Sequence, residues 1–327
     1  MPVRCGPFPE ADAGRDRRRV SRSLAACRMK ALALVAALLL GTAAAGRPPE
    51  IALTFDDLPS HGPLPPGETR LSVIDGLVAA LKAAHVQHVW GFVNGRGLAR
   101  EAGTAGVLEK WRAASFPLGN HGWNHSDLDK VGAPSFLDEI DFNTPILTGQ
   151  MAGQDWHWFR FPYLHEGSDP AQRRAVRDGL ATRGYRIAGV TMSFGDFMWN
   201  DAYARCAASG NDAAIRQLEQ TYLTAATEAA RASRHAAQGA MGRDIPYILL
   251  MHVGAFDARM LPRLLAQYRR EGFRFVTLEQ AARDPFYAAD VDPRLGAAPT
   301  LEARLKDAGG KPLEIPSYSE MLGAICR

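Results

Sequence analysis

Short apolar runs alternate with segments of helical periodicity along most of the chain. The runs that have the length and composition of buried strands are residues 51–55, 86–93, 116–119, 157–161, 187–190, 247–252 and 273–276. The segments with helical periodicity are residues 71–84, 104–114, 134–149, 170–183, 212–238 and 258–271. This α/β alternation predicts a parallel sheet, and seven or eight such units would close it into a distorted (β/α) barrel.

The pattern also predicts the organisation of the chain. No tandem repeat, low-complexity block or linker interrupts residues 50–285. We therefore expect one domain over residues 46–285, followed by a tail, 286–327, that packs on it. The tail is rich in proline, glycine and charge and has little apolar periodicity of its own.

The first 45 residues have the pattern of a leader. An arginine cluster precedes Met29, an apolar run covers residues 31–40, and small residues surround a cleavage site expected after Ala45. The run is too short to cross a bilayer, which takes about 20 residues. Met29 favours a start there, although a long basic leader for another export route stays open. We expect an exported protein, periplasmic or extracellular, whose mature chain has no transmembrane span.

The composition is that of an ordinary globular protein, and its informative feature is the distribution of charge along the chain. The 327 residues are 46% hydrophobic and 22% charged, which excludes a disordered or collagen-like chain. The net charge is +3, but eight basic and three acidic residues lie in the leader, so the remainder is slightly acidic. Nucleic acid is therefore not an expected partner.

Four cysteines divide between the leader and the mature chain. Cys5 and Cys27 belong to the leader, which leaves Cys206 and Cys326. In an oxidising compartment this pair is a disulfide candidate that would hold the tail, and two unpaired thiols are the alternative.

Polar residues follow three of the predicted strands where each strand ends. They are Asp56-Asp57, the segment 120–125, and His252. The carboxyl ends of parallel barrel strands form one face, where active sites lie, so these groups could converge.

Two histidines in the segment 120–125 have the spacing of metal ligands. His121 and His125 lie four residues apart, so one helical turn would place both imidazoles on one side. With one carboxylate they would form a three-ligand site of the kind found in hydrolytic zinc sites. Asp56 and Asp57 could instead cap a helix or turn; if they are functional, one binds the cation and the other accepts a proton.

Five motifs in order resemble those of the polysaccharide deacetylases, the family-four carbohydrate esterases with the nodulation-deacetylase homology domain. The resemblance covers roughly residues 50–280. The motifs are Thr54-Phe55-Asp56-Asp57, Asn120-His121-Gly122-Trp123-Asn124-His125, Phe159-Arg160-Phe161-Pro162-Tyr163, Asp196-Phe197-Met198-Trp199 and Leu250-Met251-His252.

The resemblance implies a role for each motif residue. Asp57, His121 and His125 would bind one divalent metal, zinc by preference. Asp56 would be the general base, paired with Arg160, and His252 the general acid, oriented by Asp196. The backbone N–H of Tyr163 would stabilise the oxyanion, and the residues expected at the substrate are Tyr163, Trp199 and Leu250.

Two departures from the family pattern affect the third and fourth motifs. Leu164 stands where the family usually has glycine, and the fourth motif is loose, so that either Asp196 or Asp201 could serve His252. His165, in the loop that follows, is expected to be exposed. The remaining histidines, His61, His85, His88, His157 and His235, have no partner at metal spacing and are expected at the surface or in the core.

The resemblance implies an N-deacetylase that acts on an amino-sugar polymer or oligosaccharide. A deformylase or amidase with the same site, acting on a non-polymeric amide, stays open because of the altered motifs. A non-catalytic glycan-binding module is disfavoured because Asp56 and His252 are both present. A metalloprotease is disfavoured because the chain has no His-Glu-x-x-His helix.

Overall fold

The computed structural model describes residues 47–101 and 103–327. Residues 48–327 form one compact unit, and the predicted leader with its signal peptide lies outside the described residues. No helix among the residues described is both long and apolar enough to cross a membrane.

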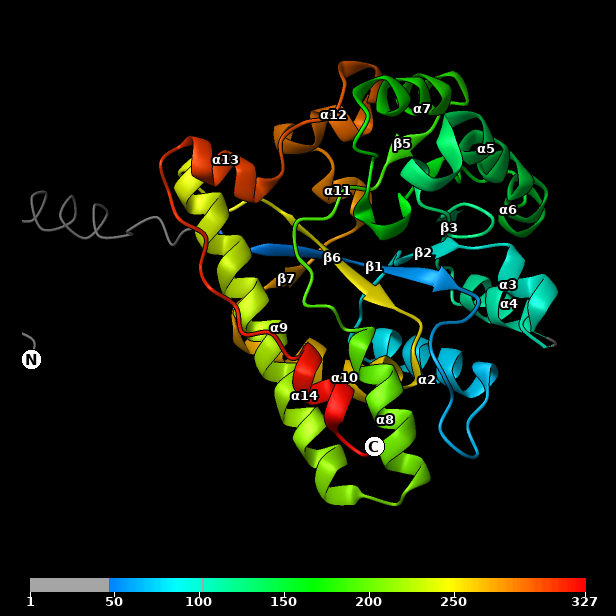
Figure 1. Cartoon of the computed structure of the whole chain (residues 1–327), viewed down its shortest axis with the longest axis vertical. Coiled ribbons are helices and arrows are strands. Elements are labelled where there is room, and N and C mark those ends of the chain that lie inside the picture. Colours follow the sequence, from blue (N-terminus) through cyan, green and yellow to red (C-terminus); the bar gives the residue numbers. More distant parts are fainter. Residues whose placement is uncertain (1–46, 102) are drawn as a thin grey trace, which may run out of the picture. The chain divides into compact units, whose positions relative to one another are not determined.

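Seven parallel strands form one sheet in the order β5-β4-β3-β2-β1-β6, and β7 pairs with the beginning of β1. The strands are β1 Glu50–Leu58, β2 Trp90–Val93, β3 Leu118–Asn120, β4 Trp158–Phe159, β5 Arg186–Ile187, β6 Tyr247–His252 and β7 Arg274–Phe275. Figure 1 shows β1 and β6 side by side at the centre of this unit. The predicted fold class, a distorted parallel (β/α) barrel, is confirmed.

The distortion lies between β5 and β6, which do not pair directly. The chain that leaves β5 turns toward β6 instead: the N–H groups of Thr191 and Met192 donate to the carbonyl of Ile248, both at 3.1 Å. The N–H of Leu250 in turn donates to the carbonyl of Met192 at 3.1 Å. An irregular segment thus completes the ring of hydrogen bonds that short β5 leaves open.

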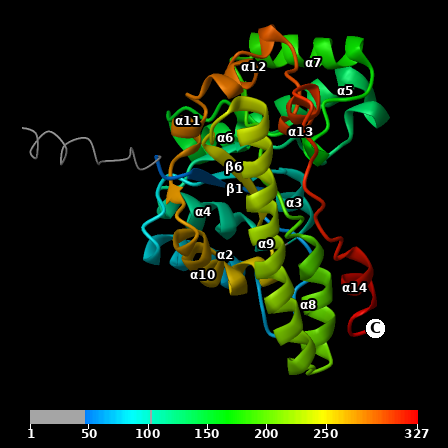
Figure 2. The same cartoon turned by 90° about the vertical axis from the view of Figure 1, so that its left-hand side faces the viewer.

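Helices cover the strands on both sides, with α2 and α10 packed together on one side and α5 and α7 on the other (Figures 1 and 2). The helices are α2 Arg70–Ala83, α3 Arg96–Arg100, α4 Ala105–Ala113, α5 Leu128–Phe142, α6 Thr144–Met151, α7 Pro170–Thr182, α8 Met198–Ala208, α9 Asp212–Met241, α10 Ala255–Arg270, α11 Leu278–Ala281, α12 Ala288–Val291, α13 Leu301–Asp307 and α14 Ser319–Ala324.

Several helices differ from the prediction, and two of these differences have a clear local cause. The segment predicted as one helix over 134–149 is divided at Asn143 into α5 and α6, and Pro145 occupies the first turn of α6, where a missing N–H costs nothing. Helix α8 was not predicted, because its buried face includes the polar Asn200 and its start lies within a motif.

The long helix α9 shows how the apolar pattern fixes an element. Ile215, Leu218, Tyr222 and Ala226 lie at spacings of three and four and are all buried. The Asn211 side chain accepts a hydrogen bond from the N–H of Ala214 and so caps the helix.

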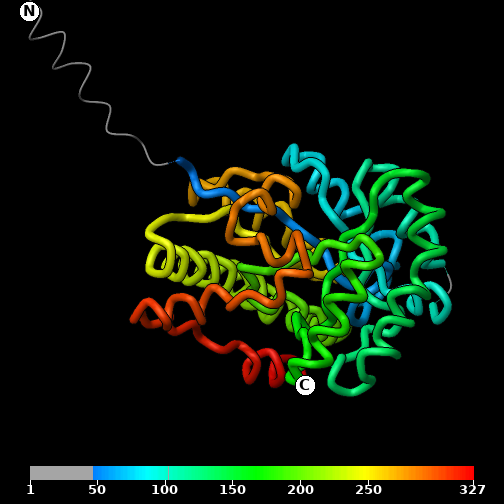
Figure 3. Tube along the Cα trace, turned by 90° about the horizontal axis from the view of Figure 1, so that it is seen from above, coloured from blue at the N-terminus to red at the C-terminus, as the bar shows by residue number. Residues whose placement is uncertain are grey.

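The tail beyond residue 285 first contacts β5 through α12 and α7 through residues 293–295, and then runs along α9 and α8 (Figures 2 and 3). Helix α13 contacts α9 and α14 contacts α8. Cys206 in α8 and Cys326 after α14 form a disulfide with a Cα–Cα distance of 5.1 Å. The Arg205 side chain also donates to the carbonyl of Leu322 at 2.6 Å, so α14 is held at two points.

Candidate metal and catalytic site

The polar residues that follow β1, β3 and β6 lie together at the carboxyl ends of these strands. Asp56 and His252 are register partners in the pairing of β1 with β6. His121 comes directly after β3, and its N–H donates to the carbonyl of Val93 at the end of β2. The convergence follows from parallel strand direction, because every strand delivers its last residues to the same face.

Asp57, His121 and His125 form a cluster of three possible ligands. The Nε2 atoms of His121 and His125 each lie 3.6 Å from Oδ1 of Asp57. The two imidazoles do not come together through a helical turn, which corrects the sequence expectation. They belong to a loop in which Gly122 and His125 have φ values of 73° and 57°.

This geometry fits a divalent cation. Two ligand atoms bound to one tetrahedral zinc at about 2.0–2.1 Å are separated by about 3.4 Å, close to the distances between these side-chain atoms. Nδ1 of His121 lies 2.7 Å from the carbonyl of Arg160, which can only accept, so this nitrogen donates and Nε2 is the ring atom left to bind a metal. Burial and the neighbouring His121 lower the pKa of His125, which favours the neutral form that a metal requires.

Two buried asparagines hold the histidine loop in place. The Asn120 side chain donates to the carbonyl of Ile140 and to the Tyr185 hydroxyl, and it accepts from the N–H of Gly122. The Asn143 side chain donates to the carbonyls of Val93 and Gly122 at 2.7 and 2.9 Å. These amides satisfy the backbone of a loop that has no helix to do so.

We expect Asn143→Ala to lower the free energy of unfolding by about 3 kcal/mol, because the buried N–H of Gly95 loses its acceptor and the carbonyls of Val93 and Gly122 each lose one hydrogen bond. Asn211→Ala, which removes the single capping bond of α9, is the comparison and should cost about 1 kcal/mol. Urea unfolding measures both values. Equal losses would contradict a special role of Asn143 in the loop.

Asp56 is almost fully buried against Arg160. Nη1 of Arg160 lies 3.1 and 3.3 Å from the two Asp56 oxygens. Nη2 donates to the Thr54 hydroxyl at 3.0 Å, and Nε donates to the carbonyl of Ala188 at 2.6 Å. With all its nitrogens engaged, the guanidinium fixes one orientation of the Asp56 carboxylate.

His252 pairs with Asp196 and not with Asp201. Nδ1 of His252 lies 3.0 Å from Oδ1 of Asp196, and the His252 N–H donates to Oδ2 at 2.7 Å. Asp201 is exposed, on α8. Burial by itself lowers the pKa of His252, but the Asp196 carboxylate and the more distant Asp57 and Asp56 raise it to about 10. The contact with Asp196 therefore favours the protonated form of the imidazole.

A histidine expected at the surface or in the core, His61, lies directly beside the cluster. Nδ1 of His61 lies 2.7 Å from Oδ2 of Asp57, and its ring centroid is 4.7 Å from that of His252. Burial by itself raises the pKa of Asp57, but the hydrogen bond from His61 and the His121 and His252 imidazoles lower it far below its usual range. Its position four residues after Asp57, following a strand, was the only signal in the sequence.

The three residues expected to contact the substrate differ in their exposure and in their distance from the cluster. The Tyr163 side chain is exposed, and its ring centroid lies 4.4 Å from that of His125. Leu250 precedes His252 by two on β6 and shares its face. Trp199 does not line the site: it is fully buried and packs against Phe194 and Tyr222.

Phe197 lies beside the site in place of Trp199. It is 46% exposed, and its ring centroid is 5.3 Å from that of His252. The loose fourth motif therefore contributes its second residue to the site and its last residue to the core. His165, outside the cluster, pairs with Asp127 at 3.0 Å.

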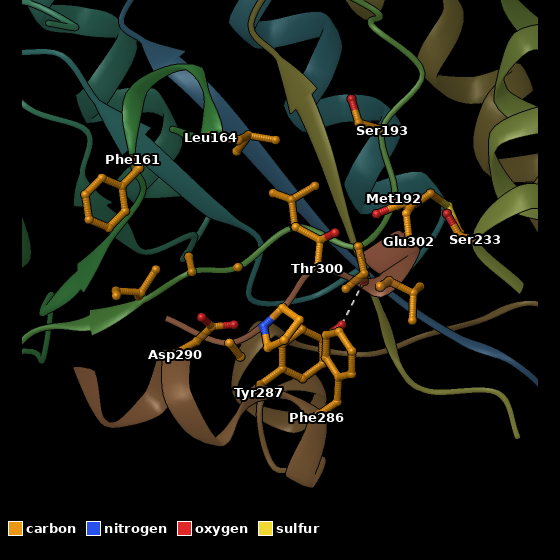
Figure 4. A pocket seen from close by; sticks show the side chains of 18 of the residues that line it. Phe161, Leu164, Met192, Ser193, Ser233, Phe286, Tyr287, Asp290, Thr300 and Glu302 are labelled. Atoms are coloured by element: carbon orange, nitrogen blue, oxygen red, sulfur yellow. Dashed lines mark hydrogen bonds between the residues drawn. The ribbon is translucent and has the colours of Figure 1, made fainter. Parts of the chain in front are cut away.

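A cavity of about 360 Å³ lies between the irregular segment after β5 and the tail (Figure 4). Arg160 borders it, but none of Asp57, His121 and His125 does. Tyr287 and Thr191 share a hydrogen bond of 2.8 Å in its wall. Burial raises the pKa of Asp290 to about 7, against the opposing effect of Arg177. This cavity is separate from the ligand cluster.

A parallel barrel with two histidines and a carboxylate at its strand ends is typical of hydrolases. Residues 43–186 match the family model described as polysaccharide deacetylase, which confirms the resemblance indicated by the five motifs. The matched segment contains the first three motifs, whereas Asp196 and His252 lie beyond it. None of the curated proteins compared with the sequence matches it significantly.

Solved structures with low sequence identity share the fold. One is a mutant, with restored enzymatic activity, of a family-four carbohydrate esterase pseudoenzyme from Bacillus anthracis; it is 15% identical, with 72% of this chain and 68% of that chain covered and a TM-score of 0.50. Two others have TM-scores of 0.49. The Xyl-CE4 domain of a xylanase from the hindgut metagenome of Trinervitermes trinervoides is 18% identical (75% and 95% covered), and the chitin deacetylase of Colletotrichum lindemuthianum is 19% identical (72% and 88%).

Proposed function

We propose that the protein is an exported metal-dependent hydrolase that removes N-acetyl groups from an amino-sugar polymer or oligosaccharide. One observation carries the proposal: Asp56 and His252, paired across adjacent strands, both lie beside the cluster of Asp57, His121 and His125. A proton acceptor and a proton donor thus lie next to a site that fits a cation. The family match supports a carbohydrate substrate.

Asp57, His121 and His125 would hold the cation, most suitably Zn²⁺ given two imidazoles and one carboxylate. A cation bound there supplies a Lewis acid that polarises the amide carbonyl and lowers the pKa of water. Asp56 then accepts the proton of the attacking water, and Arg160 keeps its carboxylate turned toward the site.

The amine leaving group must gain a proton as the amide bond breaks. His252 carries that proton, because Asp196 holds its Nδ1 and leaves Nε2 free for the substrate. The backbone N–H of Tyr163 would donate to the oxygen that becomes negatively charged. Phe197 and the Tyr163 ring offer apolar faces against which a sugar ring can pack.

Export, to the periplasm or the extracellular space, is part of the proposal. The signal-like pattern of residues 1–45 supports it, and so does the disulfide between Cys206 and Cys326, since disulfides persist in oxidising compartments.

A second candidate keeps the site and changes the substrate to a non-polymeric amide, such as a formamido sugar. The observation that favours it is the third motif, where Leu164 replaces glycine and is 44% exposed beside Tyr163. A bulky residue there would narrow the room for the sugar that flanks the reacting one. The ratio of formate to acetate release separates the two candidates.

We expect chelation to lower the release of acetate from chitin oligosaccharides or peptidoglycan fragments at least tenfold, and added Zn²⁺ or Co²⁺ to restore it. The reason is that Asp56 and His252 alone offer only proton transfer. Acetate and formate are quantified over a panel of N-acetylated and N-formylated sugars. As-purified protein without divalent metal, and no product restored by metal, would overturn the proposal.

A further inference from the structure

The His61 side chain contacts the predicted metal ligand Asp57 from outside the ligand cluster. Its Nδ1 lies 2.7 Å from Oδ2 of Asp57, and the two side chains are 21% and 15% exposed. An ionised carboxylate only accepts, so the imidazole donates through Nδ1–H. One of the two Asp57 carboxylate oxygens, Oδ2, is therefore engaged in a hydrogen bond from His61.

The two oxygens of Asp57 have separate partners. Oδ1 lies 3.6 Å from Nε2 of His121 and from Nε2 of His125, whereas Oδ2 lies beside His61. A hydrogen bond to one oxygen of a ligand carboxylate fixes its orientation and favours binding of the metal through the other. Only Oδ1 is thus presented to the cation.

The His61 ring is itself held in place. Its ring centroid lies 4.7 Å from that of His252 and 6.1 Å from that of Phe197. The carbonyl of His61 accepts from Nη1 of Arg70 at 3.0 Å, and Arg70 is bound in turn by Glu101. A ring fixed by backbone and side-chain contacts can orient a carboxylate without losing much side-chain entropy on doing so.

A direct role as ligand fits the distances less well. Asp57, His61 and His252 also have ligand atoms within 4.8 Å of one another. However, two atoms bound to one zinc lie about 3.4 Å apart, whereas the 2.7 Å between His61 and Asp57 is the length of a hydrogen bond. Nδ1 of His61 and Oδ2 of Asp57 are therefore joined by a hydrogen bond and do not both bind one metal ion.

We propose that His61 is a positioning residue that holds Asp57 as a one-oxygen ligand, through Oδ1, of the cation bound with His121 and His125. The inference rests on the proposed function, because it needs a metal at that cluster. His61 lies outside the five motifs, whereas Asp57, whose orientation it sets, lies within the first of them.

Two variants separate the hydrogen bond from the ring. His61→Phe keeps an aromatic ring and removes the donor, whereas His61→Asn places an amide N–H near the position of Nδ1. His88→Gln is the matched control, because His88 forms an exposed contact of 3.3 Å with Glu279 away from the site. Each protein is stripped of metal and titrated with Zn²⁺ against a chromophoric chelator, and the absorption of its Co²⁺ form is recorded.

We expect His61→Phe to weaken Zn²⁺ binding by about 10- to 100-fold, and His61→Asn and His88→Gln to stay within about threefold of the wild type. In His61→Phe the freed carboxylate can bind through both oxygens, so the visible absorption of Co²⁺ should weaken as its coordination number rises. Neither measurement uses a substrate, so both are independent of the deacetylase reaction.

Unchanged Zn²⁺ affinity and an unchanged Co²⁺ spectrum in His61→Phe would overturn the inference and leave the proposed function standing. Loss of a second bound Zn²⁺ in this variant would also overturn it, because His61 would then be a ligand. Wild-type protein that binds neither metal would overturn the inference together with the proposed function.

Discussion

Asp56→Asn is expected to lower acetate release by about a thousandfold while zinc binding stays close to that of the wild type. The amide has nearly the shape of the carboxylate but cannot accept the proton of the attacking water, and general-base catalysis contributes about 10²–10⁴ in rate. The metal ligands are left unchanged. Initial rates at saturating zinc, with zinc affinity measured on the same preparation, provide the test.

The buried Arg160 makes a stability control necessary. Removing the charge of Asp56 leaves the guanidinium without its counter-ion, and breaking a buried pair costs about 3–5 kcal/mol. Rates must therefore be measured well below the unfolding temperature of the variant. Asp75→Asn makes the same chemical change at an exposed pair with Lys110 and should alter neither rate nor stability. Asp56→Asn with more than a tenth of wild-type activity would rule out Asp56 as the base.

Replacing both cysteines of the disulfide by serine is expected to lower the free energy of unfolding by about 4–5 kcal/mol. Cys206 and Cys326 are 120 residues apart, and closing so long a loop removes much of the conformational freedom of the unfolded chain. Denaturant unfolding of the wild type and of the double variant measures the difference.

The single variants Cys206→Ser and Cys326→Ser, and reduced wild-type protein, serve as controls for this result. All three should unfold at nearly the same denaturant concentration as the double variant, because each lacks the same cross-link. A double variant as stable as the oxidised wild type would show that the contacts of α14 with α8 suffice to hold the tail.

The sequence predicted the strands well where apolar runs are long. Residues 247–252 form β6 with the predicted bounds, and 51–55 lie within β1. The predicted strand at 86–93 is observed only from Trp90. Before it, Val86 and Val89 are buried but Gln87 and His88 are exposed, so apolar side chains are buried there without strand pairing. The tail helices were missed because each is too short to repeat a helical apolar pattern.

The candidate site was predicted in its composition but not in all its contacts. Asp56, Asp57, His121 and His252 lie together, as parallel strands require. His61 could not be recognised, since its contact with Asp57 depends on how the chain turns after β1. The sequence pattern also could not predict that Trp199 is buried, because the residue at which α8 starts decides which face of that helix is buried.

The pairing of β1 with β6 limits which parts of such a site can vary between related proteins. Asp56 and His252 are opposite residues of two hydrogen-bonded strands, so the spacing of a sheet, about 4.8 Å, sets the distance between their backbones. The segments around them, such as the loop with Leu164 and the start of α8 with Phe197, are free of that constraint. Insertions and substitutions there can change what the protein recognises while the backbones that carry the proton acceptor and the proton donor keep their spacing.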